Sequence, residues 1–201
     1  MASDAVTAPR AVSVTGILLA GGSSTRFGSF KLLHPVDGVP MVVKSALAMK
    51  MALGAVLVAV RPGSACLPTL LEHGLAVIEC PRAPEGMGGT LADAVAAVAP
   101  SAHGFVIGLA DMPFIAVESI RAVARALEGG AVLAAPAYRG RRGHPVGLAA
   151  SYRHELLELQ GDAGARAILK RDDATLTVVA LDDPGVLRDI DTPADLLNTH
   201  L

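Results

Sequence analysis

The feature that most constrains the fold of this chain is the alternation of short apolar runs with longer amphipathic segments. Runs of this length and composition predict β-strands, whereas the segments between them have helical periodicity. The expected strands are residues 14–20, 55–60, 75–78, 105–110, 131–135 and 176–180, and the expected helices are 40–51, 90–98 and 117–127. Strand followed by helix, repeated along the chain, predicts a mainly parallel sheet.

The expected strands are apolar throughout rather than alternating between apolar and polar residues, as residues 105–110 illustrate. A strand of this kind is buried on both sides, so helices should cover both faces of the sheet. We therefore expect a three-layer α/β sandwich. In such sheets ligands bind outside the carboxyl ends of the strands, which makes polar residues that directly follow a strand the candidates for a site.

Length and composition favour one domain that acts on a small molecule. The 201 residues are 52% hydrophobic, enough for one sizeable core, and we expect a single domain over 12–201 after a flexible tail at 1–11. A net charge of −2, 3% aromatic residues and no basic block argue against a nucleic-acid partner. No apolar run is long enough to span a membrane, and Cys66 and Cys80 lack metal-ligand spacing. We expect a soluble, cytoplasmic protein.

The loop after the first expected strand is rich in Gly and Ser and carries two cations, Arg26 and Lys31. Glycines let backbone N–H groups approach phosphate oxygens, and the cations can neutralise charge that develops as pyrophosphate leaves. The spacing matches neither the Walker pattern nor GxGxxG. We expect this loop to bind a nucleoside triphosphate, with Arg26 and Lys31 also catalytic, through Leu19, Ala20, Gly21, Gly22, Ser23, Arg26 and Lys31. A plain connecting turn is the alternative.

Carboxylates stand at two further positions that suit a cation. Asp111 directly follows the expected strand 105–110, where it can bind a hard cation such as Mg²⁺ that bridges phosphate oxygens. Its alternative role is to cap the helix at 117–127. Asp189 and Asp191 share a face of an extended segment, so one of them can supply a second ligand. Thr192 and Pro193 are also typical of a helix start, which leaves Asp191 open as a turn residue.

From Leu19 to Lys31 the chain resembles the LAGG-x-x-x-R-[MF]-G-x-x-K signature of the MobA/MocA-like molybdenum cofactor nucleotidylyltransferases. The resemblance extends from Gly16 to about Leu197 and includes, in the family's order, Gly86-Met87 with Thr90-Leu91, Gly108 to Pro113, Gly143-His144-Pro145, Gly161-Asp162 with Gly164-Ala165-Arg166, and Asp189 to Pro193. It implies a Rossmann-like sheet. It also implies nucleotide contacts at Gly86, Met87 and Thr90, a metal held by Asp111 (also catalytic) and Asp191, and acceptor contacts at His144, Asp162 and Arg166.

For these acceptor residues the sequence also permits ordinary structural roles. His144 beside a proline can be a hydrogen-bonded loop residue, and Asp162 and Arg166, four apart, can pair along a helix. The nearby arginines Arg139, Arg141 and Arg142 can clamp an acceptor phosphate or form a solvated hairpin tip.

The resemblance implies a Mg²⁺-dependent transfer of a nucleoside monophosphate from CTP or GTP to molybdopterin, with release of pyrophosphate and delivery of the product to a molybdoenzyme. The string Leu19-Ala20-Gly21-Gly22 resembles guanylyltransferase members, whereas the segments at 86–91, 143–145 and 161–166 resemble the MocA-like side, so we favour CTP. The alternatives are a sugar phosphate or another small phosphate as acceptor, and a non-catalytic accessory protein of a molybdoenzyme.

Overall fold

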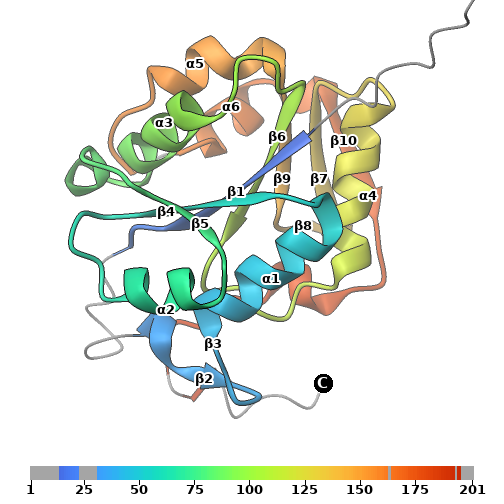
Figure 1. Cartoon of the computed structure of the whole chain (residues 1–201). Coiled ribbons are helices and arrows are strands. Elements are labelled where there is room, and N and C mark those ends of the chain that lie inside the picture. Colours follow the sequence, from blue (N-terminus) through green and yellow to red (C-terminus); the bar gives the residue numbers. More distant parts are fainter. Residues whose placement is uncertain (1–13, 23–30, 163, 193, 196–201) are drawn as a thin grey trace, which may run out of the picture.

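The computed structural model describes residues 14–22, 31–162, 164–192 and 194–195 (Figure 1). The expected tail at 1–11 lies outside these residues. Among them, eight strands form one sheet in the order β10-β7-β9-β6-β1-β4-β5, and β8 pairs with β7. The strands are β1 (Val14–Ala20), β4 (Val56–Val60), β5 (Ala76–Glu79), β6 (Gly104–Leu109), β7 (Leu133–Tyr138), β8 (Arg141–Arg142), β9 (Val146–Ala149) and β10 (Leu176–Ala180). A small separate hairpin joins β2 (Pro35–Val36) to β3 (Val39–Pro40).

The sheet is mainly parallel, which confirms the sequence prediction. β1 lies between β4 and β6 and is parallel to both, β5 is parallel to β4, and β10 is parallel to β7. β9 runs antiparallel to β6 and β7, and β8 runs antiparallel to β7. All six predicted strands are present with ends shifted by a few residues, whereas the two antiparallel strands and the small hairpin were not predicted.

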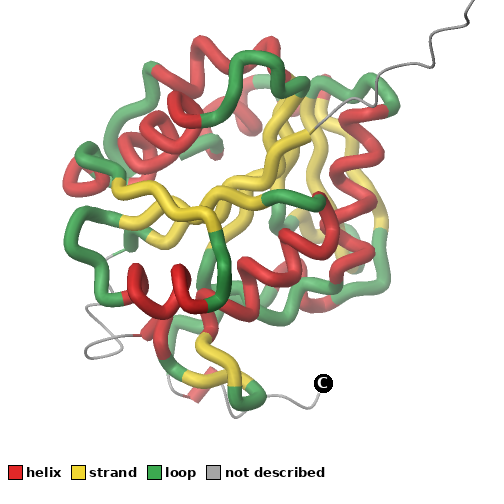
Figure 2. Tube along the Cα trace, viewed as in Figure 1, coloured by secondary structure: helices red, strands yellow, loops and turns green. Residues whose placement is uncertain are grey.

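Helices cover both faces of the sheet, and Figures 1 and 2 show the resulting layers. On one face lie α1 (Met41–Leu53), α2 (Cys66–Glu72) and α4 (Val117–Glu128). On the other lie α3 (Met87–Ala97), α5 (Arg153–Leu157) and α6 (Arg166–Arg171). Short 3-10 turns connect them: η1 (Lys31–Leu33), η2 (Ala83–Glu85), η3 (Ala150–Tyr152), η4 (Asp173–Thr175) and η5 (Pro184–Leu187). The fold is therefore the expected three-layer α/β sandwich with a Rossmann-like sheet.

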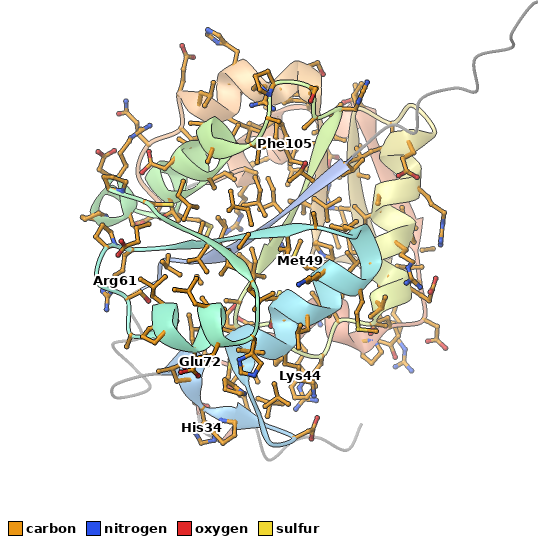
Figure 3. All side chains as sticks on the ribbon, in the orientation of Figure 1. His34, Lys44, Met49, Arg61, Glu72 and Phe105 are labelled. Atoms are coloured by element: carbon orange, nitrogen blue, oxygen red, sulfur yellow. The ribbon has the colours of Figure 1, made fainter. Side chains whose placement is uncertain are left out.

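Apolar side chains fill the space between the layers (Figure 3). Met49 of α1 belongs to the core on one side of the sheet, and Phe105 of β6 belongs to the core on the other. Gly108 lets α1 approach the sheet, because a Cβ at this position would lie 2.7 Å from the Met49 sulfur. None of the helices in the described part of the chain combines the length and the apolar character that crossing a bilayer requires.

The parallel arrangement brings the carboxyl ends of β1, β4 and β6 to one edge of the sheet. Gly21 follows β1, Arg61 follows β4, and Asp111 lies just beyond the end of β6. The backbone N–H of Ala110 donates to the Leu19 carbonyl at 3.0 Å, so β1 and β6 stay joined up to this edge. Three segments that are far apart in the sequence therefore meet where a ligand site is expected.

Candidate nucleotide and metal site

A pocket of about 580 Å³ lies at this edge of the sheet. It contains every predicted strand-one loop residue that the structure describes, together with both predicted metal ligands. Its lining residues are Leu19, Ala20, Gly21, Gly22, Lys31, Leu32, Arg61, Ala83, Pro84, Gly86, Met87, Thr90, Leu109, Asp111, Asp162 and Asp191. Ser23 and Arg26, which the sequence also places here, lie outside the described residues.

Lys31 lies between two carboxylates. Its Nζ donates to Oδ2 of Asp111 at 3.0 Å and to Oδ1 of Asp191 at 2.8 Å. The Lys31 side chain is 8% exposed, whereas those of Asp111 and Asp191 are 29% and 55% exposed. Burial lowers the pKa of Lys31, but the hydrogen bonds and negative charges of Asp191 and Asp111 outweigh it, so the pKa lies above its usual value of 10.5. Lys31 is thus a protonated cation at neutral pH.

The turn that carries Asp111 is fixed by hydrogen bonds on both sides. The Ser45 hydroxyl of α1 donates to the Ala110 carbonyl at 3.0 Å, and the N–H of Ile190 donates to the Asp111 carbonyl at 2.9 Å. The second bond places the segment of Asp191 alongside the Asp111 turn. The alternative role of Asp111 as the cap of α4 is wrong, because the N–H of Ala116 bonds to the Asp183 carboxylate at 2.9 Å.

Close packing holds the C-terminal segment in place. A Cβ at Gly185 would lie 2.1 Å from the Phe114 carbonyl oxygen, and a Cβ at Gly143 would lie 1.9 Å from that of Val186. Asp183 ties η5 to α4 by accepting from the Ser119 hydroxyl at 2.6 Å. Since no larger side chain fits at either glycine, the backbone approaches closely enough to bring the acidic segment 189–191 against the pocket.

Asp191 stands next to a turn, as the sequence leaves open, but its carboxylate faces the pocket. The Asp195 carboxylate accepts from the backbone N–H groups of Asp191 at 3.0 Å and Thr192 at 2.6 Å. It also accepts from the Thr192 hydroxyl at 2.9 Å. Asp195 therefore satisfies the backbone of this turn and leaves the Asp191 side chain free to bond Lys31. Pro193, the other part of the predicted helix start, lies outside the described residues.

Glycines join the start of α3 to the segment around Asp162 on the other side of the pocket. The N–H of Gly88 donates to the Gly161 carbonyl at 2.7 Å, and a Cβ at Gly86 would lie 2.4 Å from Oδ1 of Asp162. The Thr90 hydroxyl donates to the Gly86 carbonyl at 3.1 Å. These contacts place Asp162 and Thr90 in the lining, and they give the glycines of this loop a packing role.

The residues present fit a divalent cation of the Mg²⁺ type. Asp111 and Asp191 offer oxygen ligands, and both bond one amine, so a single cation can reach both. Within the described residues no group of three or more His, Cys, Asp or Glu side chains is placed to hold a metal. Mg²⁺ commonly binds one or two carboxylates and takes its other ligands from phosphate oxygens and water. A two-carboxylate site in a nucleotide-sized pocket matches that pattern.

Two predicted acceptor residues do not reach the pocket. The His144 ring is largely buried, and burial lowers its pKa against the opposing effects of Asp111, Asp189 and a backbone hydrogen bond with Ile107. Its Nδ1 is buried without a hydrogen-bond partner. Arg166 is the first residue of α6 and is exposed. The structure therefore does not bring these two residues to the pocket lining, and their contact with an acceptor stays a prediction.

The sequence also permitted structural roles for Asp162 with Arg166 and for the hairpin arginines, and the structure supports only the second of these. Asp162 lies in the turn before α6, which begins at Arg166, so the two residues do not pair along a helix. Of the three arginines at the β7–β8 hairpin, Arg142 pairs with Asp173, while Arg139 and Arg141 are exposed. The hairpin arginines are thus a solvated tip.

Arg61 is a pocket residue that the sequence analysis missed. It directly follows β4 and it is exposed. Among the described lining residues, Lys31 is the other cation. Its position immediately after an apolar strand is the same signal that identified Asp111. The small apolar residues Ala83 and Pro84 of η2 were missed as well, and neither carries chemistry that a motif search detects.

Comparisons with known proteins find relatives that match nearly the whole chain. The purine catabolism protein PucB of Bacillus subtilis (strain 168) is 31% identical over 201 residues, covering 92% of this chain and 95% of that protein. Rv0371c of Mycobacterium tuberculosis H37Rv has a TM-score of 0.82 at 24% identity, over 94% of this chain and 100% of that one. A second structure of Rv0371c is a complex with manganese. A nucleotidyl transferase of Methanothermobacter has a TM-score of 0.76 at 19% identity, over 92% of this chain and 94% of that one.

Fold and pocket together define a nucleotidyltransferase. The model of the MobA-like NTP transferase domain matches residues 16–176. This match covers most of the chain, so the protein belongs to the MobA-like NTP transferase family, as the motifs at 19–31 and beyond predicted.

Proposed function

We propose that this protein transfers a cytidylyl group from CTP to the phosphate of a molybdopterin-type acceptor, with release of pyrophosphate and a requirement for Mg²⁺. Residues 12–201 would form the one catalytic domain, acting in the cytoplasm. The observation that carries the proposal is the joining of Lys31, Asp111 and Asp191 at a pocket that is also lined by Gly21 and Gly22 after β1. Its volume of about 580 Å³ falls within the range of about 300–1,000 Å³ typical of small-molecule sites.

The reaction needs positioning and charge neutralisation rather than a protein nucleophile. An oxygen of the acceptor phosphate attacks the α-phosphorus, the bond from that phosphorus to the α,β-bridging oxygen breaks, and pyrophosphate leaves with the electron pair. A Mg²⁺ ion held by Asp111 and Asp191 would supply charge stabilisation at the phosphate oxygens. Lys31, with Arg26, would neutralise the departing pyrophosphate. The buried Cys80 thiol is no substitute nucleophile, because burial raises its pKa to about 12.

The nucleotide would lie along the strand-one loop and the start of α3. Gly21 and Gly22 would offer backbone approach to the phosphates, and Gly86, Met87 and Thr90, which line the same pocket, would face the sugar and base. The preference for CTP rests on the MocA-like segments of the sequence. We add Arg61 to this set, since an exposed guanidinium after β4 can donate to phosphate or to a base edge.

The acceptor would bind beside Asp162, which lines the same pocket. His144 would then support the site from behind the Asp111 turn, as a neutral ring, and Arg166 would contact an acceptor only where that acceptor extends beyond the pocket. The name of the Bacillus subtilis relative, a purine catabolism protein, favours an enzyme of purine breakdown as the molybdoenzyme that receives the product.

The test is pyrophosphate release by purified protein with Mg²⁺ and each of the four nucleoside triphosphates, with and without molybdopterin. We expect release only when molybdopterin is present, and more of it with CTP than with GTP. Asp111→Asn serves as the matched inactive control. Release that requires a sugar phosphate instead would replace the acceptor, and a lack of release with every acceptor would favour an accessory, non-catalytic role.

A further inference from the structure

Lys31 occupies the position that a divalent cation is proposed to take. Its ammonium bonds both carboxylates in the structure, at 3.0 Å and 2.8 Å, and only 6% of the residue is exposed. The oxygens that face this ammonium belong to Asp111 and Asp191, the two proposed metal ligands. A lysine whose sole task was to bind phosphate would not need to lie between them.

An ammonium and a divalent cation compete for this pair of carboxylates. Two positive charges a few ångströms apart repel each other strongly in a partly buried site, and Lys31 already bonds one oxygen of each carboxylate. Lysine is suited to exchange, because its charge sits on a flexible stem of four carbons with rotatable donors. Lys31 lines the pocket, so a short movement of its side chain would bring the ammonium toward the space proposed for a triphosphate.

We propose that Lys31 is a built-in placeholder for the metal: it holds Asp111 and Asp191 together in the metal-free protein, and the divalent cation displaces it. The displaced ammonium then becomes available to the triphosphate, so metal and nucleotide binding are coupled through one side chain. This inference rests on the proposed function, which supplies the metal and the nucleotide. It adds a positioning role that the phosphate contact of Lys31 does not include.

The placeholder role makes an unusual prediction about metal affinity. In the protein without nucleotide, a cation must first displace Lys31, which lowers its apparent affinity by competition. Removing the positive charge at position 31 should therefore tighten metal binding. A lysine that merely supported the local structure would have the opposite effect, because its loss would disorder the carboxylates and weaken the site.

The experiment is a titration with Mn²⁺ as the probe, followed by the electron paramagnetic resonance signal of the free ion, without nucleotide or acceptor. The variants are Lys31→Met and Lys31→Gln, which remove the charge, and Lys31→Arg, which keeps it. Lys50→Met is the matched control, since it makes the same change in net charge at an exposed lysine that bonds the Gly74 carbonyl. Asp111→Asn identifies binding at the carboxylate pair, and thermal unfolding verifies that each variant is folded.

We expect both neutral variants to bind Mn²⁺ roughly tenfold more tightly than the wild type, the scale of one displaced charge-assisted pair. Lys31→Arg and Lys50→Met should remain close to the wild type, and Asp111→Asn should bind far more weakly. Unchanged or weaker binding in a folded neutral variant overturns the placeholder, as does equal tightening in Lys31→Arg. Because these titrations contain no substrate, the placeholder proposal can fail while the proposed transferase activity stands. If no variant and no wild-type protein shows saturable Mn²⁺ binding, the metal site fails in both proposals.

Discussion

Replacing Gly21 by alanine should destabilise the protein through Thr90. A Cβ at position 21 would lie 2.9 Å from Oγ1 and 3.1 Å from Cγ2 of Thr90, which is inside normal contact distance. Thr90 is 2% exposed, and its hydroxyl donates to the Gly86 carbonyl at 3.1 Å. The side chain therefore cannot move away without losing that hydrogen bond or shifting the backbone of α3.

The size of the effect follows from these two routes. Overpacking of a buried site costs about 1–3 kcal/mol, and loss of one hydrogen bond costs about 0.5–1.5 kcal/mol. We expect a loss of about 1–2 kcal/mol in the free energy of unfolding, or roughly 2–8 °C in Tm for a chain of this length. Thermal unfolding followed by circular dichroism measures it. Gly22→Ala is the matched control, because a Cβ at Gly22 meets nothing within 4 Å.

A second substitution tests the assigned cause. Thr90→Ala removes both Oγ1 and Cγ2, so Gly21→Ala combined with Thr90→Ala should recover at least about 0.5 kcal/mol relative to the sum of the single variants. The reasoning fails if Gly21→Ala is as stable as Gly22→Ala. It also fails if the double variant shows no coupling, since the strain would then arise elsewhere.

The same variants bear on base selection. From the sequence, an added methyl at Gly21 is expected to crowd a purine more than a pyrimidine and to shift preference toward CTP. The structure directs that methyl at Thr90, so any shift should reach the base through displacement of Thr90, which lines the pocket. The CTP/GTP ratio of kcat/KM should rise in Gly21→Ala and return toward the wild-type value in the double variant. An unchanged ratio would show that neither Gly21 nor Thr90 influences the choice of base.

Other substitutions test the remaining assignments. Asp111→Ala should abolish turnover at any practical Mg²⁺ concentration while the protein stays folded, and Asp191→Ala should be less severe; substantial activity in a folded Asp111→Ala protein contradicts the metal assignment. Lys31→Ala, and Arg26→Ala in the part not described, should lower kcat by roughly 10²-fold, and a change confined to KM would indicate uniform binding instead. Burial lowers the pKa of His144 below its usual 6.5. At a pH above 6.5 the ring is neutral in both the folded and the unfolded chain, so it costs no stability. As the pH falls below 6.5 the unfolded chain binds a proton that the folded chain resists, and stability is lost. Urea unfolding at pH 7 and pH 5 should therefore show a smaller acid loss in His144→Gln than in the wild type.

The fold was predictable wherever burial leaves a strong pattern. The central strands β1, β4 and β6 are covered on both faces and appear in the sequence as continuous apolar runs. β9 has four residues, including Gly147, and antiparallel pairing leaves no mark in so short a run. The helices α5 and α6 are also short, with five and six residues, so periodicity cannot identify them.

The site was predictable in part for a related reason. Parallel strands end at one edge, so residues that follow β1 and β6 were expected to meet, and Lys31 does contact Asp111. Arg61 was missed although it follows β4, because a single exposed arginine after a strand carries no motif of its own. For His144, the motif identified the residue but not the direction of its ring, which depends on packing by residues far away in the chain.

The way Asp191 reaches the pocket connects the folding of the chain to its chemistry. Asp111 lies just beyond the end of β6. Asp191 lies near the end of the chain, in the segment that follows η5. The Ile190 N–H to Asp111 carbonyl bond holds this segment beside the turn, and the close approach of Gly185 to Phe114 secures it from the other side. The two carboxylates therefore depend for their pairing on the docking of the C-terminal segment against the Asp111 turn. A pair of carboxylates this close repels itself unless a cation lies between the two groups, and in the structure Lys31 bonds both of them.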